Sequence, residues 1–124
     1  MLNEGLKIAK EVRDPACGKT GSIEDWGFKR VAIAYAKNGM FEESLEIASL
    51  IEWDEQKRET IDEIAKIYVE AQERDKNILN KMLKIADGIR CHDDKGRAFI
   101  AIVPAYASAG MYDDAMKLTN LIED

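Results

Sequence analysis

The run Cys91-His92-Asp93-Asp94 is the densest cluster of reactive side chains in this sequence. Thiolate, imidazole and carboxylate groups all bind zinc, but four consecutive residues cannot surround one ion, and no second Cys/His pair stands at metal-ligand spacing. We therefore interpret the run as a helix start capped by Asp93 and Asp94, and we expect no metal site and no cofactor. A small-molecule or metal-dependent sensor at Cys91 and His92 is kept as an alternative hypothesis.

Other reactive residues lack the partners that catalysis requires. His92 is the only histidine, and Cys91 next to it would point elsewhere from a helix start, so no nucleophile and base are expected to meet. The segment Cys17-Gly18-Lys19-Thr20 resembles the end of a phosphate-binding loop, but Arg13 stands where the first glycine of that loop is required. The sequence therefore predicts no catalytic residues and a protein that is not an enzyme.

Charge and composition restrict the classes of partner and compartment. A net charge of −6 repels the phosphate backbone, so no nucleic-acid binding is expected. No apolar run approaches the roughly 18 residues of a membrane span, and the first residues do not resemble a signal peptide. We expect a single domain over residues 1–124, in the cytoplasm, with Cys17 and Cys91 as reduced thiols rather than a disulfide.

One apolar pattern occurs four times along the chain. Each copy centres on a small residue, with apolar residues seven and three positions before it and three positions after it. These offsets place the residues on one face of a helix. The four central residues are Ala9, Ala48, Ala86 and Thr119.

A second pattern alternates with the first and centres on a tyrosine. Apolar residues stand seven and four positions before Tyr35, Tyr68 and Tyr106, and alanine or valine stands three positions before each. Two helices and two short turns make a unit of 33 residues, and longer stretches near 14–22 and 73–77 fall where loops are expected. The alternation predicts an internal repeat of helix pairs.

The two patterns and their flanking residues predict where helices begin and end. Seven helices are expected near residues 2–13, 23–38, 41–52, 55–72, 77–89, 94–109 and 112–122. Ser22 and Asp25 form a capping box for the second of these, and Asp54 is expected to cap the fourth. Pro104 lies inside the sixth, where a proline is expected to produce a kink.

Glycines mark two of the predicted turns. Gly39 and Gly110 each follow a central tyrosine by four positions, where a residue of left-handed conformation ends a helix. Gln72 occupies the same place after Tyr68. Because the inserted loop that follows need not use this turn, we expect a substitution at Gln72 to cost less stability than the same substitution at Gly110.

The segments 35–44 and 106–115 resemble the turn of a tetratricopeptide repeat. In the first, Tyr35 is followed by Gly39, by the aromatic Phe41 and by the small residue Ser44, and the second has the same arrangement. The resemblance implies an all-α fold, an α-α superhelix of about seven antiparallel helices. It also implies a non-catalytic scaffold that binds another protein or a peptide.

In such a fold the first helix of each pair lines a concave face, to which partners bind. The resemblance places these residues on that face: Trp26, Lys29, Ile33, Lys37, Glu59, Asp62, Lys66, Arg97, Ile100 and Pro104. Trp26 is the expected aromatic anchor, and Lys29, Lys66 and Arg97 are expected to meet an acidic partner. Self-assembly into a homo-oligomer is a second hypothesis, because helices 2–13 and 112–122 are amphipathic and no polar helix closes either end.

Overall fold

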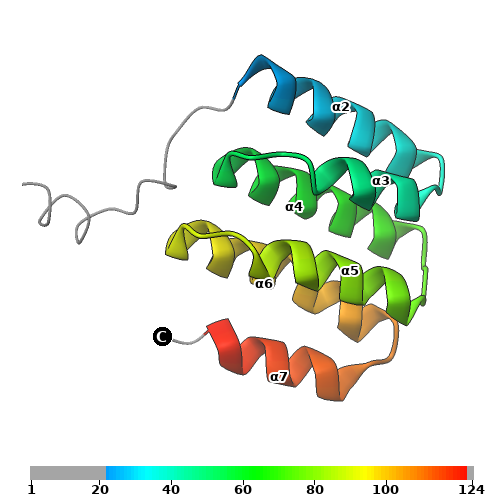
Figure 1. Cartoon of the computed structure of the whole chain (residues 1–124). Helices are drawn as coiled ribbons and strands as arrows, with labels where there is room; N and C mark the ends of the chain where they lie inside the picture. The colour runs from blue at the N-terminus through cyan, green and yellow to red at the C-terminus, as the bar shows by residue number, and fades with distance from the viewer. Residues whose placement is uncertain (1–21, 123–124) are drawn as a thin grey trace, which may run out of the picture.

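The computed structural model describes residues 22–122, and over this range the chain is all-helical (Figure 1). Its helices are α2 (Ile23–Lys37), α3 (Phe41–Ala48), α4 (Asp54–Glu70), α5 (Lys76–Asp87), α6 (His92–Ser108) and α7 (Tyr112–Ile122). The all-α class predicted from the sequence is confirmed for the described range. The predicted helix 2–13 lies outside it.

Consecutive helices form antiparallel pairs that lie side by side (Figure 1). α2 packs against α3, α4 against α5, and α6 against α7, while α4 also lies between α2 and α6. α3 contacts α5 on the other side of the stack. None of the helices between residues 22 and 122 is both long enough and apolar enough to cross a membrane.

The apolar positions of the two sequence patterns form the core. Large side chains from both helix types are fully buried, among them Leu45, Ile61, Tyr68, Leu79 and Ile102. Ala32 and Ala65 are buried on α2 and α4, where small side chains allow the two backbones to approach closely. Phe41 packs edge-on against Tyr68, with ring centroids 5.3 Å apart.

All three tyrosine-centred helices end in the same left-handed turn. Gly39, Gln72 and Gly110 have φ angles of +80°, +58° and +83°. In each turn the next N–H donates to the carbonyl of the tyrosine, over 2.9 Å at Met40 and Met111 and 3.3 Å at Glu73. This is the bonding of a Schellman cap. Gln72 therefore adopts the turn that the inserted loop was expected not to need, because the Glu73 N–H still bonds to the Tyr68 carbonyl.

Two buried carboxylates join successive helix pairs. Asp25 of α2 accepts hydrogen bonds from the N–H groups of Glu52 and Trp53, at 3.2 and 3.0 Å, just before α4 begins. Asp54 of α4 accepts from the N–H groups of Arg90 and Cys91, at 3.0 and 2.7 Å, just before α6 begins. Each carboxylate satisfies two backbone donors of the segment that leads into the next helix.

These contacts change the predicted helix caps. Ser22 caps α2 as predicted, since its Oγ accepts from the Asp25 N–H at 3.0 Å. Asp54 and the pair Asp93-Asp94 do not cap their own helices, whose N-caps are Trp53 and Cys91 without a side-chain bond. The prediction considered only the local helix start, whereas the Asp54 carboxylate is used 36 residues further along the chain.

Candidate functional site

The open side of α2 carries a hollow with a volume of about 400 Å³. The hollow is lined by Trp26, Lys29, Arg30, Ile33, Ala34 and Lys37. These residues recur at helical spacing, so their side chains share one face of α2. The hollow therefore brings together four of the predicted partner-binding residues, Trp26, Lys29, Ile33 and Lys37. It adds Arg30 and Ala34, which the same spacing could have indicated.

Lys29 connects this hollow to the next helix of the layer. Its Nζ donates to Glu59 Oε1 of α4 over 2.7 Å and lies 5.6 Å from the centroid of the Trp26 ring. A cation near an aromatic face is attracted by the ring quadrupole. The indole is thus held beside a lysine whose charge is already paired, while its other edge remains exposed.

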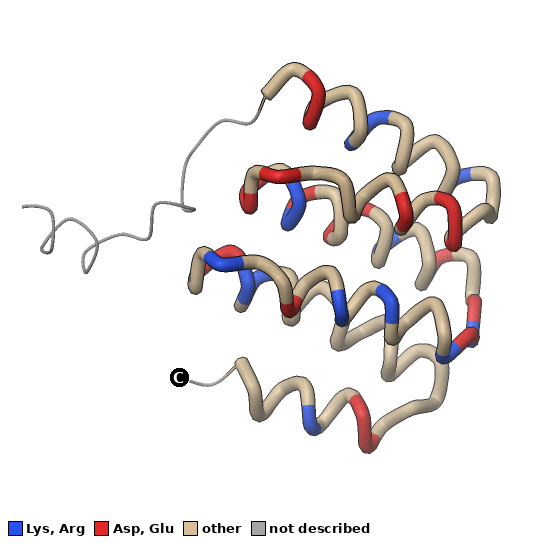
Figure 2. Tube along the Cα trace, viewed as in Figure 1, with Lys and Arg blue, Asp and Glu red and all other residues tan. Residues whose placement is uncertain are grey.

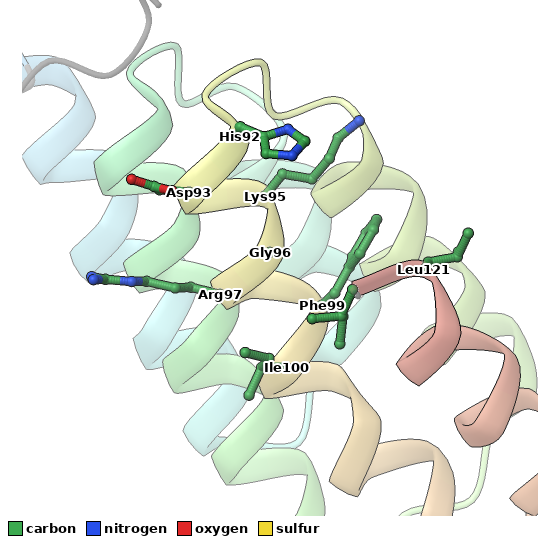
Figure 3. Close-up of a pocket in the computed structure, with 9 residues that line it drawn as sticks. His92, Asp93, Lys95, Gly96, Arg97, Phe99, Ile100 and Leu121 are labelled. Carbon is green, nitrogen blue, oxygen red and sulfur yellow. The ribbon is translucent and has the colours of Figure 1, made fainter. Parts of the chain in front are cut away.

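Two further basic residues of the predicted face, Lys66 and Arg97, lie on neighbouring helices outside this hollow. Lys66 is exposed on α4. Arg97 lies on α6 and lines a separate hollow of about 350 Å³. Figure 3 shows Asp93 and Arg97 on one side of α6, and Phe99 on the other side, near Leu121 of α7. The four residues of the hollow, together with Lys66 and Arg97, therefore occupy three adjacent helices rather than one cavity.

The charges on the layer of α2, α4 and α6 differ from helix to helix (Figure 2). The open side of α2 is basic through Lys29, Arg30 and Lys37. Trp26 stands nine positions before the central tyrosine of α2. The same position holds Glu59 on α4 and Arg97 on α6. One surface position thus carries an aromatic, an acidic and a basic residue on successive helices.

Two of the four residues considered for metal binding, Cys91 and Asp94, are engaged in other contacts. Cys91 is buried and disulfide-bonded, so the expectation of a reduced thiol is wrong for this residue, while Cys17 lies outside the described range. Asp94 Oδ1 accepts from Arg58 Nε over 3.2 Å, and His92 and Asp93 are exposed. No group of three or more His, Cys, Asp or Glu side chains between residues 22 and 122 could hold a metal ion. The Gly18-Lys19-Thr20 segment is also outside that range.

Two buried tyrosine hydroxyls have pKa values above that of an exposed tyrosine. Burial raises the pKa of Tyr106 to about 12, with further contributions from Asp114 and Tyr68. Burial also raises the pKa of Tyr68, whose hydroxyl accepts from the Asp75 N–H at 2.7 Å and donates to the Asp75 carbonyl at 3.0 Å. The Tyr106 hydroxyl donates to Asn80 Oδ1 over 2.9 Å. Both groups stay neutral and hydrogen-bonded at physiological pH, which suits packing better than proton transfer.

Comparison with known proteins found no matching family model, no matching curated protein and no matching solved structure.

Proposed function

We propose that this chain is a non-catalytic, tetratricopeptide-like scaffold that binds another protein or a peptide across the open face of α2, α4 and α6. In this proposal the three helix pairs belong to a short α-solenoid, and the layer of α2, α4 and α6 is its concave side. The proposal also keeps the predicted absence of nucleic-acid and membrane partners.

The hollow on α2 is the observation that carries the proposal. It combines a half-exposed indole with the aliphatic side chains of Ile33 and Ala34, and it is bordered by cations. Tryptophan and arginine dominate binding energy at protein interfaces, and an aromatic anchor needs an apolar recess beside it. A partner with an apolar side chain next to acidic groups fits this combination.

Helix α6 offers a second point of contact on the same face. Pro104 lies inside this helix and has no N–H, so the carbonyl of Ile100 lacks its usual helical donor. Ile100 is exposed, and Arg97 stands one turn earlier. An extended peptide could therefore donate a main-chain N–H to this carbonyl while an acidic side chain meets Arg97.

The predicted cytoplasmic location stays a prediction. A disulfide at Cys91 is more usual in oxidising compartments, although intracellular proteins of hyperthermophiles also contain disulfides. Fractionation of the native cells would decide between these settings. The proposed binding face uses none of the residues around Cys91.

The two tryptophans of the chain provide a matched test. Trp26 lines the hollow, whereas Trp53 is also partly exposed but lies at the N-cap of α4, outside it. With a partner captured from native extract, Trp26→Ala should weaken binding by at least about 2 kcal/mol, because a central aromatic anchor is lost. Trp53→Ala should bind like the wild type. Isothermal titration calorimetry measures both affinities.

Thermal melting shows whether either variant has lost its fold. If Trp26→Ala melts near the wild type and binds as tightly, the proposed face is not the binding site. If both variants lose affinity equally, the interface is not centred on α2.

A further inference from the structure

The C-terminal end of the helix stack exposes residues at positions that are buried between helix pairs elsewhere. Tyr112 of α7 stands seven positions before its small central residue and is 67% exposed, whereas Phe41 at the same position of α3 is 5% exposed. Met116 is likewise exposed, while the corresponding Leu45 is buried. The face of α7 that includes Tyr112 and Met116 is named the trailing face.

The opposite end of the described stack shows the complementary feature. Val31 of α2 stands four positions before its tyrosine and is 46% exposed, whereas Ile64 and Ile102 at the same position of α4 and α6 are 0% exposed. Met40, just before α3, is exposed, while the corresponding Ile78 of α5 is buried. The face of α2 and α3 that includes Val31 and Met40 is called the leading face.

The two internal joints have oppositely charged residues at corresponding positions of the sequence. At the first joint Lys29, six positions before its tyrosine, binds Glu59, nine positions before the next tyrosine. The same two positions at the second joint hold Asp62 and Arg97, which again have opposite charges.

We propose that copies of this chain associate head to tail, with the trailing face of one copy packed on the leading face of the next. The joint between copies would reproduce the joint between α4 and α6, and it would bury Met116, Tyr112 and Val31. A head-to-tail interface joins two different faces, so association continues into a ring or an open filament rather than stopping at a two-fold dimer. This inference goes beyond partner binding on the open face of α2.

The residues of the two end faces favour a second copy of this chain as their binding partner. Inside the chain, each helix pair packs on the apolar face of the pair before it, and the two end faces have the residue types of those internal faces. A repeat protein remains soluble as a single chain when the outer face of each terminal repeat is polar. The trailing face has exposed apolar side chains instead. The competing occupant of the leading face is the predicted helix 2–13 of the same chain, which would leave the protein monomeric.

Three full-length variants test the proposal by light scattering coupled to size exclusion. Wild type should exceed the monomer mass of 14.0 kDa and grow with concentration. Met116→Lys on the trailing face and Val31→Lys on the leading face should each weaken association at least tenfold and elute as monomers. Leu50→Lys, an exposed apolar residue in the loop between α3 and α4, should associate like the wild type. Melting curves confirm that all three variants fold.

Mixing the two end variants gives the decisive result. Each retains one intact face, so an equimolar mixture of Met116→Lys and Val31→Lys should form a dimer of twice the monomer mass although neither associates alone. A wild type that remains monomeric at every concentration overturns the proposal. Association that is abolished by Met116→Lys but unaffected by Val31→Lys would also overturn the proposal, because that pattern indicates contact between two trailing faces. Loss of association in Leu50→Lys would show that any added charge disrupts it, and would equally overturn the proposal. None of these variants alters the hollow on α2, so the outcome is separate from the test of the proposed function.

Discussion

The joints between helix pairs and the open face of α2, α4 and α6 are built from the same helices but are determined by different contacts. At the joints, Asp25 and Asp54 are buried and each accepts two backbone N–H groups from the segment that enters the next helix. On the open face, one sequence position holds Trp26, then Glu59, then Arg97. Buried backbone donors require an acceptor, so the joints restrict the residue type, whereas an exposed position is restricted by whatever binds it. Stability should therefore depend on the joints and specificity on the open face.

The largest expected effect is at the second joint. Asp54→Ala removes the acceptor of two buried N–H groups and should lower the free energy of unfolding by about 3 kcal/mol or more, since each unpaired donor costs about 1–3 kcal/mol. Glu63→Ala, on the exposed side of the same helix, should change it by no more than about 0.5 kcal/mol. Urea denaturation followed by circular dichroism measures both. Equal effects would show that the joint carboxylate contributes no more than an ordinary surface charge.

Substitutions at two of the left-handed turns should change the stability of the protein in opposite directions. A non-glycine residue with positive φ costs about 1–2 kcal/mol, so Gln72→Gly should stabilise the protein by about 1 kcal/mol after the entropy of glycine is subtracted. Gly110→Ala should destabilise it by about 1 kcal/mol. A Cβ at Gly110 would meet no atom within 4 Å, so that cost reflects φ rather than a clash. Differential scanning calorimetry compares the melting temperatures, and a lower one for Gln72→Gly would contradict the turn geometry.

The smallest expected effect is confined to alkaline pH. The pKa of Tyr106 is raised from about 10 in the unfolded chain to about 12 in the fold, so the neutral hydroxyl favours folding. This contribution is complete below pH 10 and is lost as the pH rises from about 10 to about 12, because the unfolded chain ionises first. Tyr106→Phe cannot ionise, so its stability should fall less steeply in that window. Denaturant titrations at several alkaline pH values compare the slopes, and equal slopes would contradict the role of the buried hydroxyl.

Local patterns were sufficient to predict most of the described helices. The apolar spacing around Ala48, Ala86 and the three central tyrosines predicted the start of each described helix to within two residues, and the bounds of α7 were predicted correctly. α3 ends at Ala48 rather than near residue 52, because the N–H groups of Leu50 and Ile51 bond three residues back as a turn. The periodicity of apolar residues continues through this turn and hides the helix end.

Contacts between distant segments could not be predicted in this way. Asp25 and Asp54 look like ordinary helix-start carboxylates, and only the packed structure shows that they serve donors 27 to 37 residues away. In the candidate site, too, helical spacing predicted the contacts within one helix but not those between helices. The four residues on α2 share one hollow because helical spacing places them together, whereas Arg97 lines another hollow with the end of α7.

Oxidative footprinting of the two tryptophans tests the binding account most directly, because both indoles are partly exposed in the free protein. Hydroxyl-radical labelling followed by mass spectrometry would compare the free chain with its complex with the captured partner. If the partner binds the open face of α2, it should lower the oxidation rate of Trp26 severalfold and leave that of Trp53 unchanged. Protection of Trp53 with Trp26 still fully reactive would contradict the binding account and would place the partner away from the open face of α2.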